Sequence, residues 1–301
     1  MAMKVIKDVR EMRRWALEAR GKKRPIVFVP TMGFLHDGHK ALLRLGGAVA
    51  KTMAGQAGRG GGDGGLVLSI FVNKLQFGPK EDFNAYPRDI DRDFNIAKRA
   101  GVKVLFAPSS EDVYGKGHKT FVDVKGLSSK LCGASRPGHF SGVATIVLKL
   151  FNIVEPDVAI FGKKDYQQLL IIKKMVKDLD LGVAIREADT IREPDGLAMS
   201  SRNAYLTKVE RKAASIVPAS IAVAKEAFSA GERRGPEIVR KVKKIMEKEG
   251  RVMIEYVKIC DPETLDDIGR IEKDALLAMA VRIGMARLID NCMLTAANGR
   301  S

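Results

Sequence analysis

Short apolar runs alternate with longer stretches of helical periodicity over the first two thirds of the chain, and this alternation constrains the fold most. The apolar runs predict buried strands at Pro25–Val29, Leu66–Val72, Val102–Phe106 and Asp157–Phe161. Helices are expected from near Gly38, over Asp89–Ala100 with Gly101 as C-cap, over about Ala144–Phe151, and over Tyr166–Asp178. Strands that alternate with helices predict an α/β fold with a doubly wound parallel sheet.

The pattern changes after about residue 190. Amphipathic helices are predicted at Lys208–Ser229 and Pro236–Glu249, and strands with turns at Arg251–Asp261 and Ala275–Asp290. This mixture is typical of a smaller α+β domain. We therefore expect an N-terminal nucleotide- and substrate-binding domain over residues 1–187 and a C-terminal lid domain over residues 188–301, with the boundary near Glu187.

Composition narrows the class of protein. Hydrophobic residues make up 46% of the 301 residues and charged residues 29%, as in soluble globular proteins. No apolar run approaches the roughly 18 residues of a membrane span, and Met1–Arg20 lacks the apolar centre of a secretory signal. Cys132, Cys260 and Cys292 have no paired spacing, so neither a disulfide framework nor a zinc site is predicted, and a cytoplasmic location is expected.

The charge balance admits several partners. Lys and Arg number 52 against 36 Asp and Glu, a net charge of +16, which is compatible with nucleic acid, with anionic small substrates, or with a solvated basic surface. The basic residues are dispersed, with a modest concentration in Arg233–Lys248, and aromatic residues make up only 6%. A nucleic-acid binder would need stacking aromatics or a concentrated basic face, so no nucleic-acid partner and no membrane partner are expected.

A glycine-rich segment covers Ala54–Gly65, with the sequence AGQAGRGGGDGG. It lacks the Gly-Lys-Ser/Thr ending of a phosphate-binding P-loop. We therefore expect a flexible surface loop between a helix and the second strand.

Two histidines follow the first predicted strand in Pro30–His39, PTMGFLHDGH. If a helix begins at Gly38, His36 and His39 lie at its N-terminal end, where free N–H groups and a partial positive charge suit a phosphate. Gly33 and Gly38 would let the backbone approach a ligand closely. The spacing alone is also compatible with a metal site or with two surface histidines, but ligands of open α/β sheets bind beyond the carboxyl ends of strands.

Three further segments carry ligand-type side chains. Asn73 and Gln76 follow the second strand, and their amides can hold a hydroxyl or a carboxylate, although a loop amide is more often turn chemistry. Gly162, Lys164 and Asp165 follow a later strand; the lysine suits a phosphate, and the aspartate suits a ribose, a helix cap or a metal. Met199–Arg202 places two hydroxyls and a guanidinium in one short loop that could close over a triphosphate.

The four segments together resemble a known family. His-Asp-Gly-His resembles the His-x-Gly-His signature of the nucleotidylyltransferase superfamily, whose core is Rossmann-like, and Met-Ser-Ser-Arg resembles its second, mobile phosphate-binding signature. Within that superfamily, five ordered motifs look like pantothenate synthetases: PTMGFLHDGH, SIFVNKLQFGPKEDFNAYPRD, RPGHFSGVATIVLKLFNIVEPD, FGKKDYQQ and REPDGLAMSSRNAYL. The similarity runs from about Pro25 to Leu206 and continues weakly through Tyr256–Ile268 and Ala275–Asn291.

The resemblance implies ATP-dependent condensation of pantoate with β-alanine through a pantoyl adenylate, with release of AMP and pyrophosphate. It implies an ATP site made of Met32, Gly33, Phe34, Leu35, His36, Asp37, Gly38, His39, Gly162, Lys163, Lys164, Asp165, Ile191, Met199, Ser200, Ser201 and Arg202. His39 would be the family's catalytic histidine, and the groups that stabilise the leaving pyrophosphate would be His36, His39, Lys164, Ser200 and Arg202.

It also implies how the other reactants are held. Gln76 and Gln168 would hold pantoate, with Gln76 also near β-alanine, and Arg136 and His139 would edge the site. Mg²⁺ would bridge the phosphates of ATP; its protein ligands are unknown from the sequence, although Asp93 or Asp165 could assist. A homodimer is expected because the family often forms one.

Three positions depart from the family pattern. Lys74 stands where proline is usual, Lys163 stands where an acidic residue is usual, and the glycine-rich segment is an insertion. An alternative is a nucleotidylyltransferase that moves AMP or CMP onto a phosphorylated acceptor. It would explain the histidines but not Gln76 and Gln168, and it predicts pyrophosphate release without β-alanine.

Overall fold

The computed structural model describes residues 3–56, 65–79 and 81–295, and these residues form two compact units. The first unit comprises Met1–Val124, Pro137–Lys163 and Ile171–Asp189. The second comprises Lys125–Arg136, Lys164–Leu170 and Thr190–Ser301. The middle part of the glycine-rich segment, residues 57–64, lies outside the described residues. The division into functional domains near Glu187 stays a prediction.

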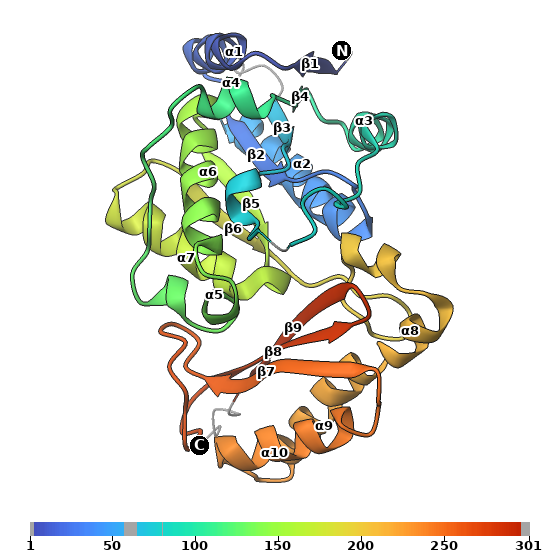
Figure 1. The fold of residues 1–301 in the computed structure, drawn as a ribbon. Helices are drawn as coiled ribbons and strands as arrows, with labels where there is room; N and C mark the ends of the chain where they lie inside the picture. The colour runs from blue at the N-terminus through green and yellow to red at the C-terminus, as the bar shows by residue number, and fades with distance from the viewer. Residues whose placement is uncertain (1–2, 57–64, 80, 296–301) are drawn as a thin grey trace. The chain divides into compact units, whose positions relative to one another are not determined.

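The first unit contains a six-stranded parallel sheet (Figure 1). Its strands are β1 (Lys4–Ile6), β2 (Ile26–Thr31), β3 (Gly65–Ile70), β4 (Val104–Phe106), β5 (Val158–Gly162) and β6 (Ala184–Ala188). Their order is β1-β4-β3-β2-β5-β6, and all the pairs are parallel. The chain leaves β2 toward β3 and returns to the other side at β5, so the sheet is doubly wound, which confirms the predicted fold class. The switch in direction lies between β2 and β5.

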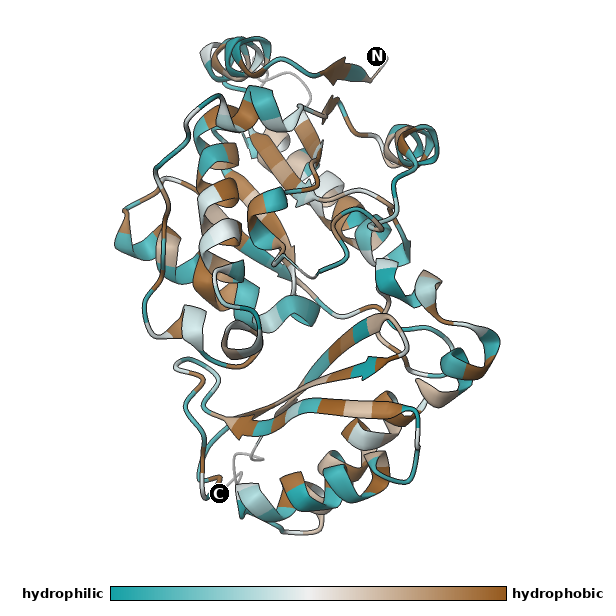
Figure 2. Ribbon diagram, in the orientation of Figure 1, coloured by the Kyte–Doolittle hydropathy of each residue, from teal (hydrophilic) through white to brown (hydrophobic). Residues whose placement is uncertain are grey.

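Helices cover both faces of this sheet. Those of the first unit are α1 (Val9–Gly21), α2 (Asp37–Gln56), α3 (Ile90–Arg99), α4 (Ser110–Tyr114), α6 (His139–Val154) and most of α7 (Tyr166–Asp178). Figure 1 shows α6 in front of the sheet and α2 behind it. Val27 and Val29 of β2 belong to the core on the α2 side, whereas Phe28 between them points to the opposite face and is equally buried. Burial on both faces explains why the central strands read as continuous apolar runs, drawn in brown in Figure 2.

The two strands of this sheet that the sequence did not predict, β1 and β6, lie at its edges. β1 exposes Lys4 and Val5, and β6 has an alternating exposed pattern, Ala-Ile-Arg-Glu-Ala. Edge strands bury fewer side chains, so neither has an apolar run. The first helix, α1, was also unpredicted, because charged residues occupy most of its surface.

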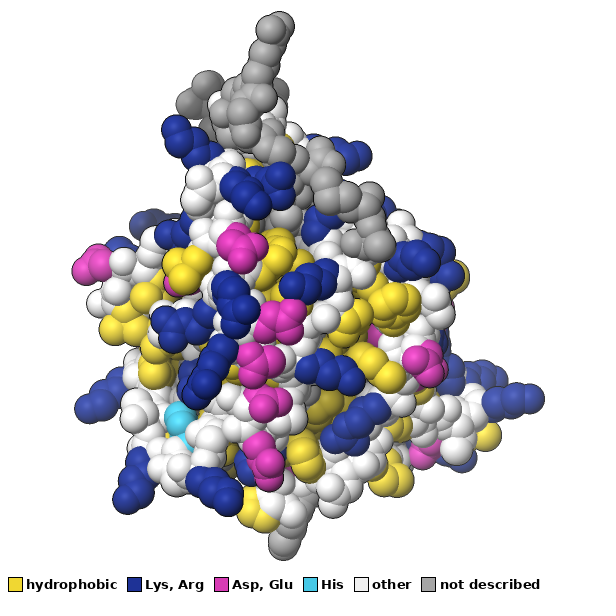
Figure 3. Space-filling model, turned by 90° about the horizontal axis from the view of Figure 1, so that it is seen from above, with side chains coloured by type: hydrophobic (Ala, Val, Ile, Leu, Met, Phe, Trp, Pro, Cys, Tyr) yellow, Lys and Arg dark blue, Asp and Glu magenta, His cyan; other side chains and the backbone are white. Residues whose placement is uncertain are grey.

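Charged residues on the first unit are interspersed by sign. Ion pairs join Lys4 to Glu11 at 2.8 Å and Lys40 to Asp37 at 2.7 Å. In the face shown in Figure 3, Asp and Glu side chains run between flanking Lys and Arg side chains. This mixing fits a solvated basic surface better than a single concentrated anion-binding face.

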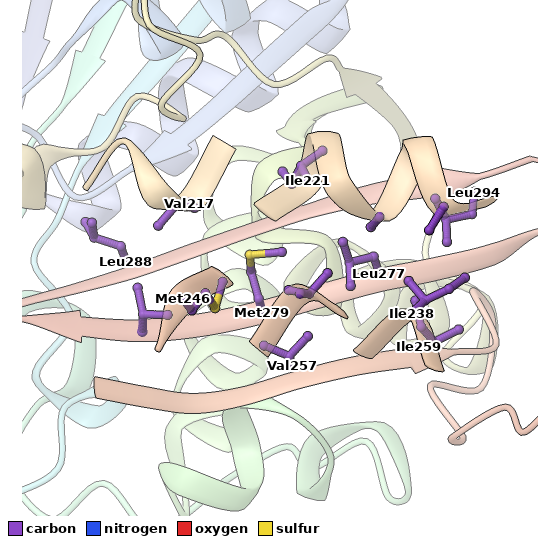
Figure 4. Close-up of a cluster of buried hydrophobic side chains, with 14 of the residues drawn as sticks. Val217, Ile221, Ile238, Met246, Val257, Ile259, Leu277, Met279, Leu288 and Leu294 are labelled. Carbon is purple, nitrogen blue, oxygen red and sulfur yellow. The ribbon is translucent and has the colours of Figure 1, made fainter. Parts of the chain in front are cut away.

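The second unit contains an antiparallel sheet in the order β7-β8-β9. Its main elements are α8 (Lys208–Ala213), α9 (Ile216–Ser229), α10 (Gly235–Met246), β7 (Val252–Cys260), β8 (Ala275–Ile283) and β9 (Ala286–Leu294). Figure 4 shows Val217, Ile221, Ile238 and Met246 of the helices gathered with strand residues such as Met279 in one core. The smaller α+β arrangement is therefore as predicted.

Two stretches from earlier in the sequence cover the other face of this antiparallel sheet. Leu127 and Leu131 come from one stretch, Tyr166 and Leu170 from the other, and all pack against a cluster that includes Leu276. This packing explains why both stretches belong to the second unit.

The predicted helix over Lys208–Ser229 is divided in the structure. α8 ends at Ala213 and α9 begins at Ile216. Pro218 lies in the first turn of α9, where its missing N–H is tolerated. In one continuous helix its ring would clash with the carbonyl of Ala214, so the break falls there. Among the described residues, no helix is both long and apolar enough to cross a membrane.

Candidate active site

The histidine pair lies at the start of α2, directly after the carboxyl end of β2. His36 precedes the helix and His39 is its third residue. The N–H of His36 donates to Nδ1 of His39 at 3.2 Å, and the N–H of Gly38 donates to Nδ1 of His36 at 3.1 Å. The two ring centroids are 4.0 Å apart. Because each Nδ1 accepts a backbone N–H, each neutral ring carries its proton on Nε2.

A buried carboxylate holds the loop in front of this pair. Asp93 of α3 is 1% exposed and accepts the N–H of Phe34 at 2.6 Å and the N–H of Leu35 at 2.7 Å. Burial raises the pKa of the Asp93 carboxyl, while the two N–H groups act in the opposite direction. The backbone of Phe34 and Leu35 therefore contacts the protein's own anion, which the sequence did not predict.

Gly33 fits this loop for a reason other than ligand approach. Its φ is +86°, and a Cβ there would lie 2.8 Å from Cγ2 of Ile70 and 3.0 Å from Oδ2 of Asp93. Space and backbone conformation both require glycine. Leu35, another residue of the predicted ATP site, has a fully buried side chain in the core of the sheet.

Asn73 is buried, and both polar atoms of its side-chain amide are hydrogen-bonded within the protein. Its Oδ1 accepts the N–H of Leu75 at 3.3 Å and the hydroxyl of Tyr114 at 2.5 Å. Its Nδ2 donates to the carbonyl of Gly142 at 3.0 Å and to Oε1 of Gln76 at 3.2 Å. Asn73 is 1% exposed, so its amide shapes the turn that carries Gln76 rather than lining an open crevice.

Gln76 ends the short helix η1 (Lys74–Gln76) and contacts two other predicted residues. Its Nε2 donates to Sδ of Met32 at 2.9 Å, and its carbonyl accepts from Nδ1 of His139 at 2.6 Å. Gly142 allows this close packing of α6, because a Cβ there would lie 2.3 Å from the carbonyl oxygen of Leu75. The first unit thus brings Met32, Gln76 and His139 together from three segments.

Gly162 and Lys163 follow at the carboxyl end of β5, still in the first unit. Nζ of Lys163 is 2.8 Å from Oδ1 of Asp189 and 3.9 Å from Oε2 of Glu187. The hydrogen bond from Lys163 to Asp189 raises the pKa of Lys163. The unusual basic residue of the FGKKD motif is therefore matched by acidic residues near the end of β6.

Lys164 and Asp165 belong to the second unit and lie side by side, with Nζ 3.7 Å from Oδ1. The carbonyl of Lys164 accepts from Nδ2 of Asn291 in β9 at 2.8 Å. The next turn of chain contains two glutamines with different roles. Gln167 is buried and binds the backbone of Leu127, Lys130 and Cys132, whereas Gln168 is half-buried.

The loop that contains Ile191 and Met199–Arg202 also belongs to the second unit. The N–H of Met199 donates to the carbonyl of Ile191 at 2.9 Å. Ser200 caps the short helix η4 (Ser201–Tyr205) by accepting the N–H of Arg202 at 3.3 Å. Ser201 is buried, and η4 packs against β9.

Ion pairs brace the part of this loop between Ile191 and Met199. Arg192 makes a two-pronged contact with Asp290 of β9, at 2.7 Å and 3.0 Å, and the Asp290 side chain is fully buried. Arg211 binds Glu193 at 2.6 Å and Asp195 at 2.7 Å. Charge-assisted, bidentate pairs of this kind fix geometry.

A family model described as pantoate-beta-alanine ligase matches residues 4–293. A pantothenate synthetase from Desulfatibacillum aliphaticivorans is 49% identical over 292 residues, which cover 97% of this chain and 99% of the relative. A pantothenate synthetase from Geobacter sulfurreducens is 48% identical with the same coverage.

Solved structures give the same picture. The crystal structure of pantothenate synthetase from Thermus thermophilus has a TM-score of 0.86 and 40% identity, covering 96% of this chain and 99% of that one. A pantoate-beta-alanine ligase from Francisella tularensis, complexed with beta-gamma ATP and beta-alanine, has a TM-score of 0.73 and 30% identity, covering 97% and 98%.

Proposed function

This chain belongs to the pantoate–β-alanine ligase family, and we propose that it condenses pantoate with β-alanine at the expense of ATP. A carboxylate oxygen of pantoate attacks the α-phosphorus, and the bond to pyrophosphate breaks. The amine of β-alanine then attacks the acyl carbon of pantoyl adenylate, loses a proton, and AMP leaves. The Francisella relative, complexed with beta-gamma ATP and beta-alanine, supports this choice of reactants.

The histidine pair carries this proposal. The pair follows β2, and Gly162 ends β5, so both are at the switch point where ligands of doubly wound sheets bind. His36 and His39 each have Nδ1 engaged by backbone, which makes Nε2–H the donor of each neutral ring. We assign these donors to phosphate oxygens, where they stabilise charge that develops as pyrophosphate leaves.

The remaining assignments follow the motif positions. We propose that Gln76 and Gln168 hold pantoate, with Gln76 also near β-alanine. The thioether of Met32, which Gln76 contacts at 2.9 Å, is a weak acceptor, so exchange for a pantoate oxygen is favourable for the amide. The proposed ATP contacts outside Met32–His39 are Gly162, Lys163, Lys164, Asp165, Ile191, Met199, Ser200, Ser201 and Arg202. Of these, Lys164, Ser200 and Arg202 stabilise the leaving pyrophosphate together with the histidines.

Magnesium fits this site as a companion of ATP rather than as a metal held by the protein. Over residues 3–56, 65–79 and 81–295, no group of three or more His, Cys, Asp or Glu side chains could hold a metal ion. Mg²⁺ usually keeps several waters and binds through substrate phosphates and one or two carboxylates. Asp93 is 1% exposed and has each oxygen on a backbone N–H group, so the half-buried Asp165 suits that role better than Asp93. The homodimer and the cytoplasmic location remain predictions.

The test is an assay of the purified chain with ATP and magnesium, with pantoate present or absent and β-alanine present or absent. We expect pantothenate, AMP and pyrophosphate in equal amounts, and sustained turnover only when both substrates are present. Pyrophosphate release that needs a phosphorylated acceptor and ignores β-alanine would instead identify a nucleotidylyltransferase.

A further inference from the structure

We propose that Asp93 is a positioning residue for the histidine pair, a role that rests on the proposed function of that pair. Its carboxylate holds the turn Gly33–Leu35 in place and thereby sets the backbone N–H groups that orient His36 and His39. The proposal assigns the carboxylate to the loop rather than to a metal ion.

The turn that Asp93 binds has an unfavourable backbone. Gly33 has φ +86° and Phe34 has φ +51°, so two successive residues are left-handed. Phe34 has a Cβ, and side-chain-bearing residues adopt this region only when the surroundings hold them there. The conformation points the N–H groups of Phe34 and Leu35 to one side, where they form a concave site for an anion. Asp93 fills that site, with Oδ2 on Phe34 and Oδ1 on Leu35.

The carboxylate itself is rigidly placed. Asp93 lies in the first turn of α3, whose N-cap Asp89 accepts the N–H of Arg92 at 3.0 Å. Ile96 and Ala97, on the next turn, are buried in the same core as Leu35. The guanidinium of Arg92 lies 4.9 Å from the centre of the Phe34 ring, a second contact between α3 and the turn. A loop that would otherwise relax is therefore fixed to the packed core.

The turn leads directly to the imidazoles. Leu35 is joined to His36, whose N–H donates to His39, and the N–H of Gly38 donates to His36. If Leu35 moves, both backbone donors move, and the rings lose the contacts that place their protons on Nε2. Misplacement of catalytic groups by about 1 Å can cost roughly 100-fold in rate.

The geometry also separates this role from metal binding. Oδ2 accepts the N–H of Phe34 at 2.6 Å, and Oδ1 accepts the N–H of Leu35 at 2.7 Å. Gly33 also lies close to Oδ2, because a Cβ on Gly33 would be only 3.0 Å from it. A magnesium ligand would need an oxygen directed at the phosphates. Asp93 instead has each oxygen directed at the backbone.

The test is the Asp93→Asn variant, which keeps the shape but turns an NH₂ group toward one backbone N–H. We expect its rate of pantoyl adenylate formation to fall about 10- to 100-fold. The magnesium concentration for half-maximal activity should stay unchanged, and the ¹⁵N signals of His36 and His39 should shift because their tautomers redistribute. Asp91→Asn, on an exposed position of the same helix, is the matched control and should leave rate and spectra as in the wild type.

Two results would overturn the proposal. An unchanged rate with unchanged histidine spectra would show that the turn does not need the carboxylate. Recovery of the full rate at raised magnesium would make Asp93 a metal ligand. If Asp93→Asn does not fold, Gly33→Ala disturbs the same contact from the other side, and it should produce the same spectral shift at an unchanged magnesium requirement. If the wild type makes no pantothenate, the proposed function fails while the histidine spectra still test the positioning role.

Discussion

Each imidazole of the histidine pair accepts a backbone N–H at Nδ1, and this settles which nitrogen of each ring can donate. The contacts are 3.2 Å for His39 and 3.1 Å for His36. The N-terminal end of the helix thus has two effects: it offers a positive environment, and the N–H groups of His36 and Gly38 fix the tautomers of the imidazoles placed there.

Substitutions of His39 can separate its two nitrogens. In His39→Asn the new oxygen can accept the His36 N–H, but nothing remains at the Nε2 position. In His39→Gln the amide reaches the Nε2 position. We expect adenylate formation in single-turnover experiments to fall about 100- to 1000-fold for Asn and less for Gln. Equal losses in both variants would contradict the Nε2 donor; His118→Gln, a histidine packed between Tyr114 and Phe121, is the control.

Residue type and spacing predict a site that contains the histidines, Gln76 and the Met199 loop, but they do not show which groups each side chain contacts. Asn73 and Gln76 look alike in sequence, and only the fold reveals that Tyr114, 41 positions away, takes the Asn73 oxygen. Asp93 acts on a loop 58 positions earlier, so no local pattern could assign its partners. Long-range hydrogen bonds therefore explain what the sequence left open.

At the scale of elements, the contact between η1 and α6 places Gln76. Gly142 faces the carbonyl of Leu75 so closely that any side chain would push the two elements apart. The hydrogen bond from Asn73 to the Gly142 carbonyl and the contact from His139 to Gln76 tie them together on either side.

The Gly142→Ala variant should therefore loosen this contact. Its Cβ would lie 2.3 Å from the carbonyl oxygen of Leu75, so backbone must shift. We expect the free energy of unfolding to fall by about 1–3 kcal/mol and the KM for pantoate to rise. Denaturant unfolding and steady-state kinetics measure the two effects. Gly182→Ala, which has open space around its Cβ, should change neither; a similar loss there would contradict the steric cause.

Periodicity predicted the buried elements well and the edges poorly. β2, β3, β4 and β5 are buried on both faces, so their apolar runs stand out, whereas β1 and β6 carry exposed polar residues. The break between α8 and α9 depends on one residue, Pro218, within an otherwise continuous helical pattern. Hydrophobic periodicity and composition are judged over a window of many residues, so they do not show the effect of a single residue.

At the scale of the whole molecule, the net charge is +16, so the basic residues repel one another. Carboxylates that pair with them reduce this repulsion and stabilise the fold. Hydrogen bonds and basic neighbours hold the pKa below its usual range for Asp37, Asp112, Asp189, Asp195, Glu210, Glu232, Glu237, Asp261 and Asp266. For Asp195 the main cause is the hydrogen bond from Arg211, and for Asp266 the hydrogen bond from Lys130. Asp93 is opposite in sign, because burial raises its pKa.

These directions predict stability against pH. A lowered folded pKa adds stability that is present above the unfolded value, about 4 for Asp, and is lost as the pH falls through the folded value. We expect the midpoint of urea unfolding to be flat above about pH 5 and to fall toward about pH 3, less steeply with added salt because salt screens the repulsion among the basic residues. If the urea midpoint instead rises on acidification, carboxyl groups with a raised folded pKa, such as Asp93, control the pH dependence of stability.

The sequence also did not predict which sheet two short segments of the chain pack against. Residues 125–136 and 164–170 lie among the motifs of the parallel sheet, yet Leu131 and Tyr166 pack against the antiparallel sheet of the second unit. The sequence of such a short apolar stretch does not indicate which of the two sheets it covers.

Each unit is assembled from three separate stretches of the chain, and this restricts how the protein can change by recombination. A single crossover near Glu187 would transfer β7, β8 and β9 without residues 125–136 and 164–170, which cover one face of their sheet. Those residues would stay behind in the donor without the sheet that they cover. The unit that carries the Met-Ser-Ser-Arg loop is therefore not an exchangeable cassette. We expect the two units to be inherited together and to accept new sequence mainly as insertions between elements.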